Sequence, residues 1–250
     1  MCQGKNVGGR HFMEQENLVR ARSHEQKLQR RADILDAARE LYLEGDGTLP
    51  SAAEVARKAN LAKGTLYLYF SSKESLFLEV LRHFQKGWFE NNLDIIDQEA
   101  LRRPEDRDST RVARQFVDYL VKNEKFLYLA SLSQGVLESG SDDEMVVGQR
   151  RFLASMVKRT ADALAELYEI TPDEANKLMR SSYALVIGLW QMSQLPDRVK
   201  KLMEQNALNN LIIDFAEAAE EAVVSYWRVV APGMKCREMM RRASEGMTVK

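Results

Sequence analysis

The chain has 250 residues, of which 45% are hydrophobic and 29% are charged, and its formal net charge at pH 7 is -1. This composition is typical of a globular protein with a hydrophobic core, and it excludes a wholly disordered or fibrous chain. The near-zero net charge excludes a polycation, so any attraction to nucleic acid has to come from local placement of basic residues.

Targeting and redox signals are sparse. The two cysteines, Cys2 and Cys236, are too few for a disulfide framework and favour a reducing compartment. Residues 1–10 lack the apolar core of a signal peptide, and the apolar run 183–190 is far shorter than the ~20 residues of a membrane helix. We therefore expect a cytoplasmic protein that has no membrane partner.

Helical periodicity recurs along the chain, whereas strand-like alternation and hairpin turns are not found. The five prolines lie between the periodic segments, where they do not interrupt a helix. Helix starts are marked by Ser or Thr followed three residues later by Glu or Gln, as at residues 23–26, 51–54, 71–74, 141–144 and 171–174. These patterns predict an all-α fold with helices over residues 24–44, 51–59, 64–70, 72–97, 109–122, 124–138, 142–169, 172–194 and 206–230, and a short helix near 197–204.

We divide the chain into four predicted parts. Residues 1–22 form a flexible basic arm, and residues 23–76 form a three-helix DNA-binding domain. Residues 77–232 form a larger helical domain for ligand binding and dimerisation, and residues 233–250 form a basic tail. The basic residues that could line a phosphate backbone, or simply form a solvated helix face, are Arg20, Arg22, Lys27, Arg30 and Arg31.

Residues 24–75 carry the most specific pattern. The first helix has a single apolar stripe and is followed by two very short helices that are joined at residues 60–63. Because isolated helices of this length are marginal in water, both have to pack against the first helix. Asn60 tolerates the left-handed backbone that a tight helix exit requires. Three helices with a tight turn between the last two make a helix-turn-helix.

The run from residue 51 to residue 76, SAAEVARKANLAKGTLYLYFSSKESL, resembles the DNA-binding signature of TetR-type regulators. The resemblance covers about residues 27–76, and KGTLYLYF followed by SSKESL is its specific part. It implies a recognition helix over residues 64–70, with Leu66 and Phe70 in the core. Ala53 and Ala62 depart from the family pattern, which often has a base-contacting arginine and a capping serine there. The residues that the resemblance and their chemistry assign to DNA are Ser51, Lys63, Gly64, Thr65, Tyr67, Leu68, Tyr69 and Lys73.

The C-terminal part is interpreted mainly from its pattern. The last helix carries small or apolar residues at heptad spacing from Leu208 to Val229, and the helix before it has small residues on one face. These stripes predict a four-helix bundle between two copies of the chain, as dimers are built in the resembled family. The alternative is that both stripes fill the core of one chain. The predicted dimer interface consists of Ser181, Leu185, Gly188, Ile212, Phe215, Ala219, Ala222 and Tyr226.

The middle helices are rich in aromatic residues and methionine, most of which we expect in the core. A subset is predicted to line a pocket for a small apolar or amphipathic effector, namely Trp88, Phe116, Tyr119, Phe152, Met156, Tyr183 and Trp190. An effector bound there would change the spacing of two recognition helices through the helix that begins at Lys73. The resemblance favours a repressor that such a ligand releases from a double-stranded DNA operator.

Catalytic and metal-binding patterns are not found. His11, His24 and His83 lack the spacing of metal ligands, and no Gly-rich phosphate loop is present. We expect neither enzymatic activity nor a metal or cofactor. The alternative to a regulator is an all-helical ligand-binding or adaptor protein that does not bind DNA.

Overall fold

The computed structural model describes residues 8–45 and 47–231, with side chains from residue 25 onward, and the predicted tail 233–250 and residues 1–7 of the arm lie outside this part. The described residues contain helices and turns and no strand, which confirms the predicted all-α class. The chain divides into two compact units, Met1–Val80 and Leu81–Lys250.

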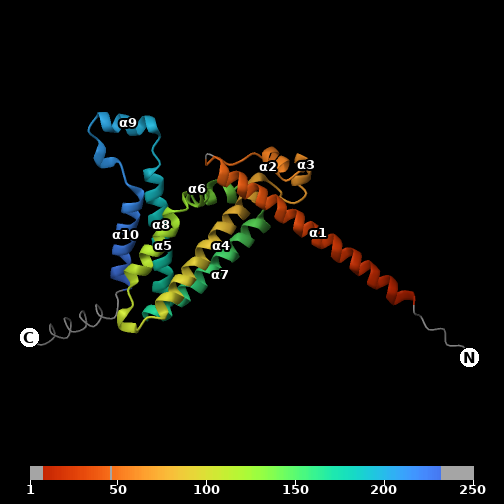
Figure 1. The fold of residues 1–250 in the computed structure, drawn as a ribbon, viewed down its shortest axis with the longest axis horizontal. Coiled ribbons are helices and arrows are strands. Elements are labelled where there is room, and N and C mark those ends of the chain that lie inside the picture. The colour runs from red at the N-terminus through yellow and green to blue at the C-terminus, as the bar shows by residue number, and fades with distance from the viewer. Residues whose placement is uncertain (1–7, 46, 232–250) are drawn as a thin grey trace, which may run out of the picture. The chain divides into compact units, whose positions relative to one another are not determined.

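The first unit contains α1 (Gly8–Glu44), α2 (Ala52–Lys58), α3 (Lys63–Leu66) and the start of α4 (Lys73–Ala100). Figure 1 shows α1 as one continuous helix. It begins well before the predicted start at residue 24, because no glycine or proline interrupts residues 10–44, and the predicted cap Ser23 lies inside it.

The core of the first unit joins all four helices. Ile34 and Tyr42 of α1, Val55 of α2 and Leu66 of α3 are fully buried, and Tyr42 meets Phe77 of α4 edge to face at 6.2 Å. An aromatic pair of this geometry is a stabilising core contact. The two short helices are therefore held by tertiary packing rather than by their own propensity.

The second unit continues along α4 and then contains α5 (Ser109–Val121), α6 (Glu124–Leu132), α7 (Asp143–Tyr168), α8 (Pro172–Ser193), α9 (Asp197–Gln205) and α10 (Phe215–Val230). Short 3-10 turns occupy Pro104–Asp106 and Asn209–Leu211. The predicted helix over residues 124–138 is divided, because α6 ends at Leu132 and a short π-helix, η2 (Ser133–Glu138), follows it. Within this unit α10 packs against α5 and α8, and α7 packs against α8 (Figure 1).

Polar side chains cap these helices. Thr171 and Glu174 form the predicted capping box, and Pro172 is the first residue of α8. Two other helices are capped one residue later than predicted. Asp142 caps α7, where residue 141 was predicted, and the Ser72 hydroxyl accepts from the backbone N–H of Ser75 at the start of α4, where residue 71 was predicted.

Buried polar groups join the helices of the second unit. The Glu99 carboxylate, almost completely buried on α4, accepts two hydrogen bonds from Arg111 of α5, each 2.8 Å long. The buried indole N–H of Trp227 on α10 donates to the Ser182 hydroxyl of α8 over 2.7 Å. Because a buried polar group without a partner is costly, each of these bonds fixes how two helices meet.

Candidate DNA-binding face and effector pocket

The turn between α2 and α3 is fixed at both of its ends. At the start of α2, Ser51 and Glu54 exchange the two hydrogen bonds of a capping box. Hydrogen bonding of the Glu54 carboxylate to the hydroxyl and to the backbone N–H of Ser51 lowers the pKa of this carboxyl. At the end of α2, Asn60 has the predicted left-handed backbone with φ 57°, and Leu61 donates to the Ala56 carbonyl at 2.8 Å. This pattern is a Schellman motif, and it directs the chain from α2 into α3.

Helix α3 separates a buried side from an outward side within one turn. Leu66 is 0% exposed and Phe70 is 2% exposed, whereas Tyr67 is 44% exposed and Leu68 is 74% exposed. The regular helix ends at Leu66, earlier than the predicted residue 70, because the following amides bond one residue closer, as in a 3-10 turn.

The other predicted DNA contacts lie around this outward side. Lys63, Gly64 and Ser51 are exposed, whereas Thr65, Tyr69 and Lys73 are half-buried. The Ser51 hydroxyl is engaged in the capping box, so this side chain shapes the start of α2. A Cβ atom added at Gly64 would have open space around it, so nothing in the chain requires a glycine there for packing. The bare backbone of Gly64 would let a phosphate group approach the start of α3 closely.

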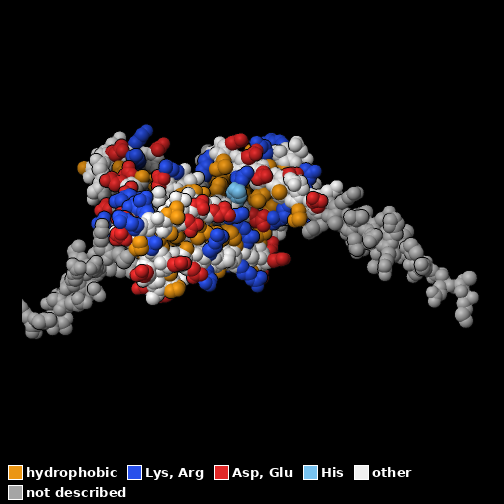
Figure 2. Space-filling model, turned by 60° about the horizontal axis from the view of Figure 1, so that its bottom comes forward, with side chains coloured by type: hydrophobic (Ala, Val, Ile, Leu, Met, Phe, Trp, Pro, Cys, Tyr) orange, Lys and Arg blue, Asp and Glu red, His pale blue; other side chains and the backbone are white. Residues whose placement is uncertain are grey.

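Two of the basic residues near the predicted DNA-binding face form ion pairs within the chain. Acidic and basic side chains are interspersed on the face of the molecule that Figure 2 shows, in line with the net charge of -1. Of the basic residues predicted to follow the phosphate backbone, Arg31 instead forms a bidentate ion pair with Glu79 and lies over the Phe70 ring at 4.5 Å. Arg31 therefore holds α1 to α4 and to the end of the α3 turn, while Arg30 is paired with Asp33 at 3.5 Å.

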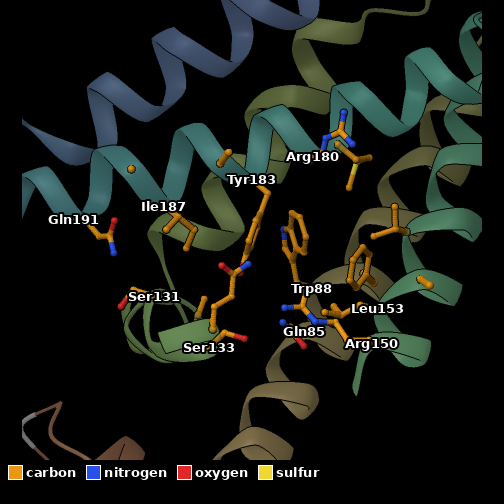
Figure 3. Close-up of a pocket in the computed structure, with 18 residues that line it drawn as sticks. Gln85, Trp88, Ser131, Ser133, Arg150, Leu153, Arg180, Tyr183, Ile187 and Gln191 are labelled. Atoms are coloured by element: carbon orange, nitrogen blue, oxygen red, sulfur yellow. The ribbon is translucent and has the colours of Figure 1, made fainter. Parts of the chain in front are cut away.

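The second unit contains a pocket of about 770 Å³ between α4, α6, η2, α7 and α8. Figure 3 shows Trp88 and Tyr183 side by side in it, and their ring centroids are 5.7 Å apart. The lining is mostly aromatic and aliphatic, with a few polar groups, as in small-molecule sites. The lining includes Gln85, Trp88, Arg150, Arg180 and Tyr183.

A buried chain of hydrogen bonds runs from this pocket to the early part of α4. The phenol of Tyr183 is hydrogen-bonded to Gln85, and burial raises the Tyr183 pKa to about 12. Gln85 accepts from Gln149 of α7 at 2.6 Å, and Gln149 accepts from Arg82 at 3.1 Å. Arg82 follows directly after the boundary between the two units, so this network extends along α4 to that boundary.

Only part of the predicted pocket lies there. Trp88 and Tyr183 line it. Phe116 packs on Trp227 in the core, Trp190 packs on Tyr128, and Phe152 lies under Arg82. Tyr119 stands beside Gly87, and Met156 is half-buried on α7 outside the lining. The sequence could not identify Gln85, Arg150 and Arg180, because whether a residue borders this cavity depends on how four helices meet.

The predicted dimer stripe needs two corrections. Helix α10 begins at Phe215, where Asp214 caps it, so Ile212 precedes the helix instead of lying on it. Ala219 is completely buried within its own unit, because this part of α10 packs on α5 and α8. Leu185 is exposed and the other predicted residues are half-buried, namely Ser181, Gly188, Phe215, Ala222 and Tyr226.

The described part of the chain contains neither a membrane-spanning helix nor a metal-binding cluster. No helix within residues 8–45 and 47–231 is long and apolar enough to cross a bilayer. Among the side chains that the structure describes, no group of three or more His, Cys, Asp or Glu residues is placed to hold a metal ion.

The two-unit helical architecture and the helix-turn-helix define the class of protein. Residues 34–80 match the family model for bacterial regulatory proteins of the tetR family, and residues 84–233 match the model for a tetracyclin repressor-like C-terminal domain. The chain therefore belongs to the TetR family, and it is a DNA-binding transcriptional regulator. This assignment supports the regulator over the adaptor alternative.

The chain is also similar to individual known proteins. The chain is 33% identical to the transcriptional repressor KstR2 of Rhodococcus jostii over 138 residues, which cover 47% of this chain and 68% of KstR2. It is 35% identical to the regulator QacR of Staphylococcus aureus over 57 residues, or 23% of this chain and 30% of QacR. The solved structure of the regulator FadR from Bacillus subtilis in complex with stearoyl-CoA has a TM-score of 0.47 and 16% identity, covering 81% of this chain and 98% of FadR.

Proposed function

We propose that a homodimer of this chain represses transcription by binding a double-stranded DNA operator in the cytoplasm, and that a small molecule in the α4–α8 pocket releases it. The observation that carries the DNA-binding part is that α3 and the turn after it bury Leu66 and Phe70 and expose Tyr67 and Leu68. The hydroxyl and ammonium groups of Thr65, Tyr67, Tyr69, Lys63 and Lys73 suit phosphate oxygens, and Leu68 suits a thymine methyl group.

The experiment for this part begins with selection of bound fragments from random DNA, which gives the operator and its symmetry. The double variant Tyr67→Ala and Lys73→Ala is expected to lose operator binding while it keeps the helical circular dichroism spectrum and the dimer. Wild-type affinity in this variant would contradict the proposed face. A matched control is Lys86→Ala, which removes an exposed lysine from α4 in the second unit and should leave the affinity unchanged.

Dimerisation is proposed through α8 and α10. Both helices keep apolar side chains at the surface of the unit, with Leu185 at 37%, Met192 at 61% and Val229 at 75% exposure. A dimer must hold its two recognition helices about 34–36 Å apart to enter successive major grooves. Light scattering of Leu185→Glu is expected to give a monomer, and an unchanged dimer would remove α8 from the interface.

The release step is proposed to run through α4. This helix begins in the DNA-binding unit at Lys73 and lines the pocket with Gln85 and Trp88. The hydrogen bonds from Tyr183 through Gln85 and Gln149 to Arg82 join the pocket to α4 just past the unit boundary. A ligand that binds one arrangement of this network more tightly shifts the balance between DNA-bound and free forms. If every molecule that binds the pocket leaves operator affinity unchanged, the release step is wrong.

A further inference from the structure

Charge is distributed unevenly among the groups around the pocket. Arg150 of α7 and Arg180 of α8 are the charged residues among those that line it, and no aspartate or glutamate belongs to this lining. Arg150 is paired with Glu138 of η2 at 2.7 Å. Arg180 forms no ion pair with any carboxylate in the described part of the chain. Both arginines are exposed, with the Arg150 side chain at 51%, so their guanidinium groups lie where the pocket lining meets solvent.

The Trp88 indole adds a third donor to the lining of the pocket. In the view of Figure 3 the Trp88 indole lies between Arg180 and Arg150. Trp88 is only 5% exposed, and its indole N–H has no hydrogen-bond partner within the described residues. Most buried polar groups have a partner, so an orphaned donor in the wall of a cavity is a site for an acceptor. Guanidinium groups make the strongest of their hydrogen bonds with carboxylate and phosphate oxygens.

We propose that the effector of this regulator is an amphipathic organic anion. Its apolar body lies among aromatic and aliphatic side chains such as Phe89, Leu153 and Val157, and its anionic head is held by Arg150 and Arg180. Carboxylate and phosphate heads share this chemistry. The inference rests on the proposed effector pocket and adds to it the charge of the ligand. An apolar molecule without an acceptor group would leave the buried Trp88 N–H without a hydrogen-bond partner.

The experiment compares two fluorescent probes of nearly the same shape. Anilinonaphthalenesulfonate carries an anionic sulfonate, and phenylnaphthylamine has the same aromatic body without it. We expect the anionic probe to bind the full-length wild-type dimer at least about tenfold more tightly, as suits a charge-assisted hydrogen bond. In the double variant Arg150→Gln and Arg180→Gln this preference should disappear, while phenylnaphthylamine binds as before.

Two further variants separate charge from folding. Arg151→Gln removes an exposed arginine next to Arg150 that does not line the pocket, and it should keep the preference for the anionic probe. Arg150→Lys retains the charge beside Glu138 and should keep most of the preference for the anionic probe. Displacement of the bound anionic probe by decanoate, decyl phosphate or decanol then shows which head group is preferred, and decanol should be the weakest competitor.

The outcomes distinguish the ligand class from the proposed function. Equal affinity for both probes, or a preference that survives in the double variant, overturns the anion inference and leaves the regulator intact. Failure of both probes to bind overturns the inference and also removes this pocket from the proposed function. If the anionic probe is preferred but operator affinity never changes with bound ligand, the anion site stands and the release mechanism fails.

Discussion

Leu66 and Leu68 offer a comparison in which two leucines, separated by one residue, serve different purposes. Leu66 is 0% exposed, and Leu68 is 74% exposed. Truncation of a fully buried leucine to alanine costs about 2–5 kcal/mol of unfolding free energy. Full burial of a leucine contributes roughly 2 kcal/mol, so the quarter of Leu68 that is buried contributes about 0.5 kcal/mol. Leu66→Ala should therefore destabilise the protein strongly, and Leu68→Ala should hardly change its stability.

The DNA affinities should show the reverse order among folded molecules. If Leu68 packs against a thymine methyl, truncation removes three carbons at about 0.8 kcal/mol each, so the loss is at most about 2.4 kcal/mol, or roughly 50-fold. Urea unfolding followed by circular dichroism measures the first effect, and fluorescence anisotropy with the selected operator measures the second. The reasoning is refuted if Leu68→Ala is as unstable as Leu66→Ala, or if it binds the operator with wild-type affinity.

Three further predictions address the helix-turn-helix and the core. Gly64→Leu should abolish operator binding without loss of thermal stability, because open space surrounds Gly64 within the chain; unchanged binding in an anisotropy titration would place DNA elsewhere. Ser182→Ala should lower the unfolding free energy by about 1–3 kcal/mol, since the buried Trp227 N–H loses its acceptor, and an unchanged urea midpoint would contradict this. Hydrogen bonds with Ser51 lower the pKa of the Glu54 carboxyl. The ionised Glu54 carboxylate therefore stabilises the fold at pH values above its pKa in the unfolded chain, and this stabilisation is lost as the pH falls through the folded pKa. Glu54→Gln should therefore flatten the fall in melting temperature in the acidic range below the ordinary glutamate pKa of 4.5, and a slope there equal to that of the wild type would exclude this contribution.

The sequence by itself determined the features that depend on near neighbours in the chain. The Schellman turn at Asn60 and the capping boxes at Ser51 and Thr171 follow from residues a few positions apart, and the structure contains all three. The same holds for the burial of Leu66 and Phe70 on one side of α3. These features could be predicted because hydrogen bonds and periodicity within one helix turn are local.

Only the tertiary structure decided which helix faces meet. Arg31 pairs with Glu79 across 48 positions of the chain, and Gln149 bonds Gln85 across 64. No local pattern marks such partners, so Arg31 was predicted either to contact a phosphate or to lie on a solvated helix face, and Gln85 was not predicted at all. For the same reason the stripe of α10 could not show that Ala219 turns inward against α5 and α8. A cavity is bounded by side chains from several helices, and its cationic lining of Arg150 and Arg180 exists only once those helices have packed.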